Sequence, residues 1–141
     1  MNTKTLLAGL VGGVAAFFLG WLIYGMVLMP IMAEHCNSSL MRAEADMIWW
    51  ALIVSNLFWG LSMALLLSWG NVTNFMTGMT RGAIFGFVLL VGIDLSYYSM
   101  TTMYTDTTGV VIDVLAGTVM NALIGGVVGW MLGRGNATAA A

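Results

Sequence analysis

Charged side chains are rare in this chain of 141 residues, which contains four Lys and Arg, six Asp and Glu and a single His. Charged residues make up 7% of the composition and hydrophobic residues 60%, whereas a soluble domain carries about 25% charged residues. Four basic side chains are too few to form the positive surface that DNA or RNA binding requires, so nucleic acid is excluded as a partner. The composition is that of an integral membrane protein.

Cysteine and histidine each occur once, as Cys36 and His35. A lone cysteine excludes an internal disulfide, although a disulfide between two copies stays open. A lone histidine excludes a haem held by two histidines. The sequence also lacks HExxH, GxSxG and GxxxxGK[ST], the motifs of common metal, serine and phosphate sites. We therefore expect no enzymatic activity and no cofactor.

Long apolar runs dominate what is present. Each is long enough to cross a bilayer as a helix of about 20 residues, and each is continuously apolar rather than alternating as in a barrel strand. The four runs span about 6–31, 48–69, 83–101 and 110–132. We predict an all-α fold, a four-helix transmembrane bundle that forms a single domain over residues 1–135, with residues 136–141 as a disordered tail.

The first run resembles a signal peptide, because Lys4 precedes an apolar stretch. The apolar stretch continues through "WLIYGMVLMPIM" without a small-residue cleavage site, so we interpret it as an uncleaved first span. Lys4, Arg81 and Arg134 lie on one side of a four-span chain and Arg42 on the other. The positive-inside rule then predicts that both termini are cytoplasmic.

Glycine recurs at a spacing of four residues in three of the runs. Such ridges let helix backbones approach closely, which matters in lipid because apolar burial no longer drives helix association. The ridges lie in the cytoplasmic half, so we expect a bundle that is tight there and wider on the outer side. The predicted packing residues are Gly9, Gly13, Gly82, Gly86, Gly125 and Gly129.

Asp94 interrupts the run "GFVLLVGIDLSYYSM" at membrane depth. An Asp at the centre of a membrane helix costs about 2.5 to 3.5 kcal/mol on insertion scales, so it usually faces a partner or a cavity. Helical spacing places Tyr97 on the same face, and the neighbouring helices bring Asp113 and Asn56 to a similar depth. These residues predict an outward-opening acidic pocket for a cation or a proton. The alternative is a structural role for both acids. Asp94 would then form a hydrogen bond between helices, and Asp113 lies near a helix start, where the macrodipole favours an acid.

A group of sulfur and imidazole side chains is a second candidate site, in this case for a metal ion. Met26, Met29, Met32, His35 and Cys36 end the first run, and thioether, thiolate and imidazole together suit copper(I). The methionines are spread evenly over the chain, however, and methionine is an ordinary core residue. We therefore expect no metal site.

The stretches "FLGWLIYG", "RGAIFGFVLLVGIDL" and "DVLAGTVMNALIGGVVGWMLG" resemble a bacterial family of small four-span membrane proteins of unknown function. That family has an N-terminal GxxWYG-like element, from which Gly20, Trp21, Tyr24 and Gly25 depart in spacing. The resemblance implies a multi-pass protein of the bacterial inner membrane and assigns no functional residue.

Two functions remain open. The first, slightly preferred, is a non-enzymatic accessory or self-associating subunit, whose partners are the lipid bilayer and other membrane helices, of its own kind or of a larger complex. The second is a small-cation or proton-coupled binding or transport protein that uses Asp94.

Overall fold

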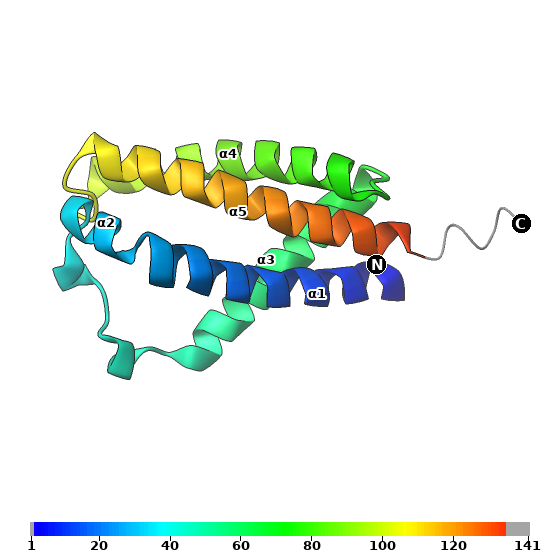
Figure 1. Ribbon diagram of the computed structural model, residues 1–141, viewed down its shortest axis with the longest axis horizontal. Coiled ribbons are helices and arrows are strands. Elements are labelled where there is room, and N and C mark those ends of the chain that lie inside the picture. Colours follow the sequence, from blue (N-terminus) through cyan, green and yellow to red (C-terminus); the bar gives the residue numbers. More distant parts are fainter. Residues whose placement is uncertain (1, 135–141) are drawn as a thin grey trace, which may run out of the picture.

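The computed structural model describes residues 2–134, and within them the chain is all-helical, with four segments long and apolar enough to cross a membrane (Figure 1). This confirms the predicted all-α fold with four helices of membrane-spanning length. The tail predicted for 136–141 lies outside the described residues. The elements are α1 Thr3–Gly20, η1 Trp21–Val27, α2 Met29–His35, η2 Ser38–Leu40, η3 Glu44–Asp46, α3 Trp49–Trp69, α4 Phe75–Met100 and α5 Thr107–Gly133.

The first span is not the continuous helix that was predicted for 6–31. α1 passes into the π-helical segment η1, in which the Leu28 amide donates to the Ile23 carbonyl at 2.8 Å, and α2 follows after a break. Pro30 lies in the first turn of α2, where its missing N–H is tolerated, whereas in the interior of a longer helix it would break the hydrogen-bond ladder. Hydropathy cannot detect this break because the residues around it stay apolar.

α4 and α5 begin earlier than hydropathy predicts, at Phe75 and Thr107 rather than near 83 and 110. Side chains cap both starts: Asn74 accepts from the Thr77 amide at 2.8 Å, and Asp106 accepts from the Gly109 amide at 3.0 Å. The 26 residues of α4 extend about 39 Å, more than the hydrocarbon core of about 30 Å. α4 is therefore longer than a perpendicular crossing of that core requires.

Glycines form the contact between α4 and α5. A Cβ built on Gly82 would meet the Asn121 carbonyl oxygen and lie 3.0 Å from the Gly125 Cα. A Cβ on Gly86 would lie 2.5 Å from the Asn121 Cβ, and one on Gly129 would lie 3.0 Å from the Gly78 Cα. The two backbones touch along this stretch, and only glycine allows that approach.

α1 packs on α3 in the same way. A Cβ on Gly9 would lie 2.9 Å from the Leu61 Cα, and one on Gly13 would lie 2.7 Å from the Leu57 Cα. Gly60 of α3 faces both positions, since a Cβ there would meet the backbone of Gly9 and Gly13. All six predicted packing glycines thus contact a neighbouring helix of the same chain.

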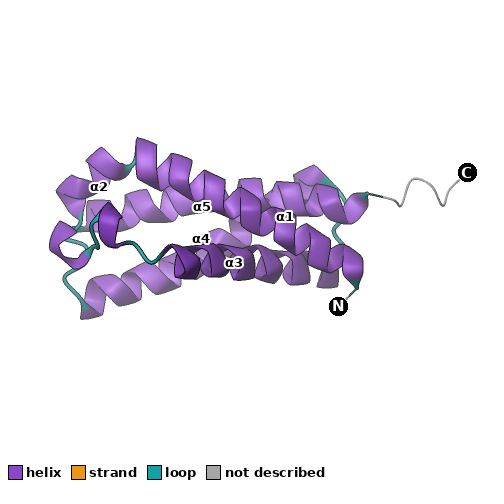
Figure 2. Ribbon diagram, turned by 90° about the horizontal axis from the view of Figure 1, so that it is seen from below, coloured by secondary structure: helices purple, strands orange, loops and turns teal. Residues whose placement is uncertain are grey.

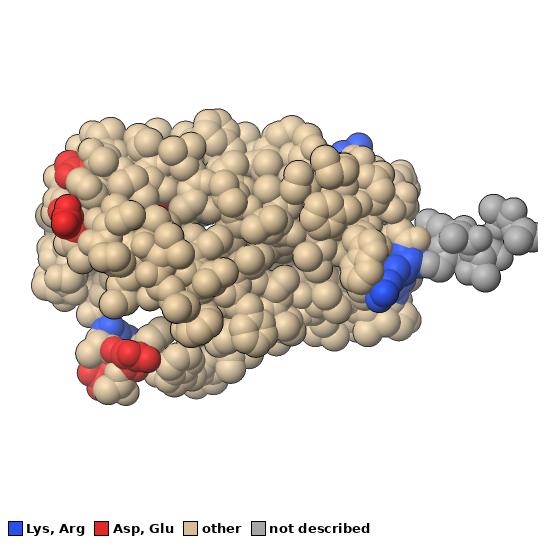
Figure 3. All heavy atoms as spheres, in the orientation of Figure 1, with Lys and Arg blue, Asp and Glu red and all other residues tan. Residues whose placement is uncertain are grey.

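The described ends of the chain, near Thr3 and Gly133, lie at one end of the bundle, which we call the terminal end; the opposite end is the distal end (Figure 1). Figure 3 shows blue basic atoms at the terminal end and red acidic atoms at the distal end, with one blue patch among the red. The basic residues of the terminal end are Lys4, Arg81 and Arg134. The distal end carries the acidic residues Glu34, Glu44, Asp46 and Asp106 together with one basic residue, Arg42.

α3 crosses the other helices obliquely and its start diverges from them at the distal end (Figures 1 and 2). The indole of Trp59 ties α3 to α5, because its Nε1 donates to Oδ1 of Asn121 at 2.8 Å. Asn121 is 2% exposed, and its Nδ2 donates to the Gly117 carbonyl at 2.8 Å. Trp59 therefore links two helices through a directional hydrogen bond.

Replacing Trp59 by Phe is expected to lower the free energy of unfolding by about 1 kcal/mol, because Phe keeps an aromatic ring but cannot donate to Asn121. Unfolding in detergent measures this loss. Trp50→Phe is the matched control, since Trp50 is 72% exposed at the start of the same helix. Equal stability of the two variants would mean that the hydrogen bond adds nothing.

Candidate functional site

Two carboxyl groups, the buried Asp94 and the partly exposed Asp113, meet near the distal end. Asp94 precedes the last residue of α4 by six positions and Asp113 follows the first residue of α5 by six, so these antiparallel neighbours hold them at the same depth, about 9 Å from the helix ends. The Asp94 carboxyl lies close enough to Asp113 to interact with it. Asp94 is 3% exposed, and its Oδ2 has no hydrogen-bond partner among the described residues.

Two tyrosines contact Asp113. The Tyr104 phenol donates to Oδ2 of Asp113 at 2.9 Å, and the Tyr24 phenol donates to its backbone carbonyl at 3.4 Å. Tyr104 is 4% exposed and also lies near Asp94. Burial raises the pKa of the Tyr104 phenol, and the negative charge of Asp113 raises it further. The phenol therefore keeps its proton and acts as a donor. We call Tyr24, Asp94, Tyr104 and Asp113 the acid–tyrosine cluster.

Local irregularities place both phenols. Tyr24 lies in the π-helical segment η1, and π turns widen a helix and recur at functional sites. Gly117 of α5 leaves room for the ring, since a Cβ there would lie 3.1 Å from the Tyr24 hydroxyl. Tyr104 lies in the loop between α4 and α5, where it pairs with Cys36 in an isolated antiparallel bridge.

The segment after α2 is fastened to that loop by its backbone. The Asn37 amide donates to the Met103 carbonyl at 2.8 Å, and the Thr105 amide donates to the His35 carbonyl at 2.9 Å. His35 Nδ1 lies 2.8 Å from Oδ2 of Asp106, the residue that caps α5. These contacts cover the distal side of the acid–tyrosine cluster.

The candidate copper ligands do not converge. Met26 and Met29 are 56% and 64% exposed, whereas Cys36 is buried. Burial raises the pKa of the Cys36 thiol, and the nearby carboxylates of Asp113 and Asp106 raise it further, which disfavours the thiolate that a metal requires. Within residues 2–134, no group of three or more His, Cys, Asp or Glu side chains is arranged to hold a metal ion.

The His35 contact lowers the pKa of Asp106, and the hydrogen bond from the Gly109 amide lowers it further. A carboxyl with a depressed pKa contributes stability above the usual Asp value of about 3.9, and this contribution is lost as the pH falls through the lower folded value. We expect the wild type to lose stability on acidification relative to Asp106→Asn, which keeps the helix cap without the charge. Thermal unfolding of both proteins across this acidic range measures the difference; parallel curves would contradict the expectation.

The structure does not place Asn56 and Tyr97 in the acid–tyrosine cluster, although both were predicted to support Asp94. Nδ2 of Asn56 donates to the Leu52 carbonyl of its own helix at 2.8 Å, and α3 diverges from α4 at this end. Tyr97 is 47% exposed. Among the described residues, no hydrogen bond joins either side chain to Asp94 or Asp113. Helix tilt decides these positions, and sequence periodicity does not report tilt.

Neither Tyr104 nor Tyr24 was predicted from the sequence as a residue of the site. Tyr104 lies outside the helices, so no periodicity could place it. The signal for Tyr24 was available: a phenol at membrane depth needs a polar partner, and the fourth run offered Asp113.

Comparison of the chain with protein-family models, with curated proteins and with solved structures finds no match. The resemblance to small four-span bacterial proteins therefore stays a prediction.

Proposed function

We propose that this protein is a non-enzymatic membrane protein that binds a proton or a small monovalent cation between Asp94 and Asp113. The observation that carries the proposal is the buried Oδ2 of Asp94, which has no hydrogen-bond partner beside a second carboxyl group. An unpaired carboxylate in such a place is strongly destabilising. A proton shared by the two acids, or a cation between them, removes both the repulsion and the unsatisfied oxygen.

The surroundings of the pair suit this role. The Tyr104 phenol donates to Oδ2 of Asp113 and also lies near Asp94, but among the described residues no donor reaches the buried Oδ2 of Asp94. Basic side chains are absent from the contacts described for the pair, so its charge is not neutralised from within the described chain. Asp113 is partly exposed, which gives a small ion access to the pair without opening the bundle.

The charge distribution supports an orientation. The basic residues Lys4, Arg81 and Arg134 lie at the terminal end, and the positive-inside rule assigns that end to the cytoplasm. The acid–tyrosine cluster then lies in the outer half of the membrane. A bacterial inner membrane is the location that the sequence resemblance suggests.

A non-enzymatic accessory or self-associating subunit is the second candidate. The glycine ridges were its main residue-level support, yet all six predicted packing glycines contact helices of the same chain. They are thus already used in folding the bundle. What favours this candidate is the oblique path of α3, which leaves open space beside α4.

The test is thermal unfolding of the purified protein in mild detergent, over a pH series and with sodium, potassium or choline chloride at equal ionic strength. A ligand that binds only the folded state raises the unfolding temperature. We expect stabilisation on acidification through the neutral range, by sodium or potassium relative to choline, or by both. An unfolding temperature that is indifferent to the proton and to the cations would refute the proposal.

A further inference from the structure

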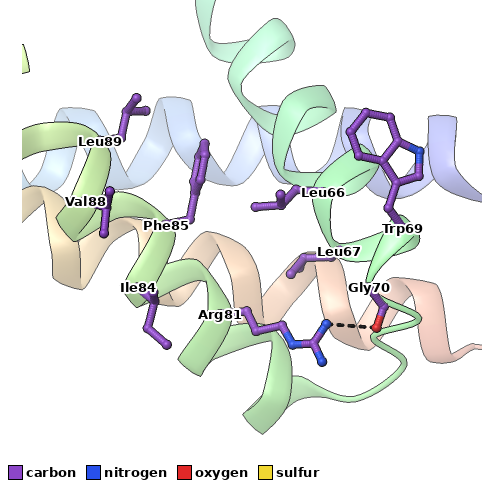
Figure 4. A pocket seen from close by; sticks show the side chains of 9 residues that line it. All are labelled: Leu66, Leu67, Trp69, Gly70, Arg81, Ile84, Phe85, Val88 and Leu89. Atoms are coloured by element: carbon purple, nitrogen blue, oxygen red, sulfur yellow. Dashed lines mark hydrogen bonds between the residues drawn. The ribbon is translucent and has the colours of Figure 1, made fainter. Parts of the chain in front are cut away.

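A groove lies between α3 and α4 near the terminal end, far from the acid–tyrosine cluster. Its volume is about 630 Å³, within the range of about 300–1,000 Å³ that is usual for small-molecule sites. The two helices barely touch along it, so its walls are apolar side chains from both (Figure 4). They are Leu66, Leu67, Ile84, Phe85, Val88 and Leu89.

The mouth of this groove is basic. Arg81 extends across it, and its Nη1 donates to the Gly70 carbonyl at 2.8 Å (Figure 4). Gly70 permits this reach, because a Cβ there would collide with Nη1. A guanidinium has five N–H donors, so this one bond leaves others for a ligand. Trp69, 76% exposed, lies beside the mouth, as interfacial tryptophans do.

We propose that the groove binds an anionic phospholipid, with an acyl chain along its apolar walls and the phosphate on Arg81. The arginine fork matches phosphate geometry, and basic pockets between membrane helices on the cytoplasmic side bind anionic headgroups. Arg81 follows the first residue of α4 by six positions. That depth is about 9 Å along the helix, where a long side chain reaches the headgroup level.

Charge complementarity favours a lipid over a second copy of this chain. A copy inserted in the same orientation would bring its own Lys4, Arg81 and Arg134 to the same level of the membrane, adding like charge at the groove mouth. An anionic headgroup instead neutralises Arg81.

The experiment uses the full chain reconstituted in vesicles of equal parts phosphatidylglycerol and phosphatidylcholine. After mild extraction, native mass spectrometry counts the lipids that stay bound. We expect one phosphatidylglycerol to be retained in preference to phosphatidylcholine, and Arg81→Gln to lower its retention about fivefold. Arg134→Gln is the matched control: Arg134 is a terminal-end arginine that stacks on the Trp130 ring and does not line the groove, so retention should be unchanged.

Two further variants test whether an acyl chain occupies the groove and whether a loss of lipid could come from misfolding. Val88 is 66% exposed on the groove wall, so Val88→Trp fills the groove without disturbing the core and should displace the lipid while Arg81 stays. Arg81→Lys keeps the charge and should retain more lipid than Arg81→Gln. Equal retention by wild type, Arg81→Gln and Val88→Trp would overturn the proposal. So would equal retention of both lipids by the wild type, or a lipid-free dimer.

Discussion

Replacing Asp94 by Asn is expected to stabilise the protein at neutral and alkaline pH and to remove the response of its unfolding temperature to protons and small cations. Asn has nearly the same shape, carries no charge and can donate a hydrogen bond to Asp113. The gain expected from satisfying a buried polar group is about 1 to 3 kcal/mol. The wild type should approach the stability of the variant only when its site is filled.

Two further variants make this result specific. Asp46→Asn removes an acidic residue from an exposed turn and should leave both stability and the cation response unchanged. Asp113→Asn should also abolish the response, but with a smaller gain in stability, because Tyr104 already donates to Asp113. An Asp94→Asn protein that unfolds at a lower temperature than wild type under all conditions would instead indicate that Asp94 is a structural hydrogen-bonding residue.

Replacing Gly82 by Ala is expected to destabilise the protein by about 1 to 3 kcal/mol, the usual cost of overpacking a close contact. The added methyl would meet the Asn121 carbonyl and the Gly125 Cα. These are backbone atoms, so the two helices must separate. Unfolding in detergent measures the loss.

Gly92→Ala is the matched control on the same helix, because a Cβ at Gly92 has nothing within 4 Å. Alanine also has a higher helix propensity than glycine, by about 1 kcal/mol in water, so this variant should be neutral or slightly stabilised. A Gly82→Ala protein as stable as Gly92→Ala would show that close packing does not constrain Gly82.

The spacing of the glycines and of the two aspartates was visible in the sequence, but their partners were not. Periodicity places Gly82 and Gly86 on one helix face, and hydropathy places Asp94 and Asp113 at similar depths. Neither pattern reveals that Gly82 and Gly86 pack against Asn121 of α5, or that Asn121 accepts a hydrogen bond from Trp59. Helical spacing and depth alone predicted the roles of Asn56 and Tyr97, but α3 crosses obliquely and Tyr97 is 47% exposed.

The sequence by itself determined that the chain has four helices long and apolar enough to cross a membrane and that Asp94 lies within one of them, because hydropathy depends only on each residue and on its position along its own helix. The tertiary structure alone decided the π-helical turn that brings Tyr24 to Asp113, the loop pairing that buries Tyr104, and the groove whose mouth Arg81 closes. These features depend on helix rotation, tilt and loop contacts. Different rotations leave the hydropathy of each span unchanged, so only packing between the helices distinguishes them.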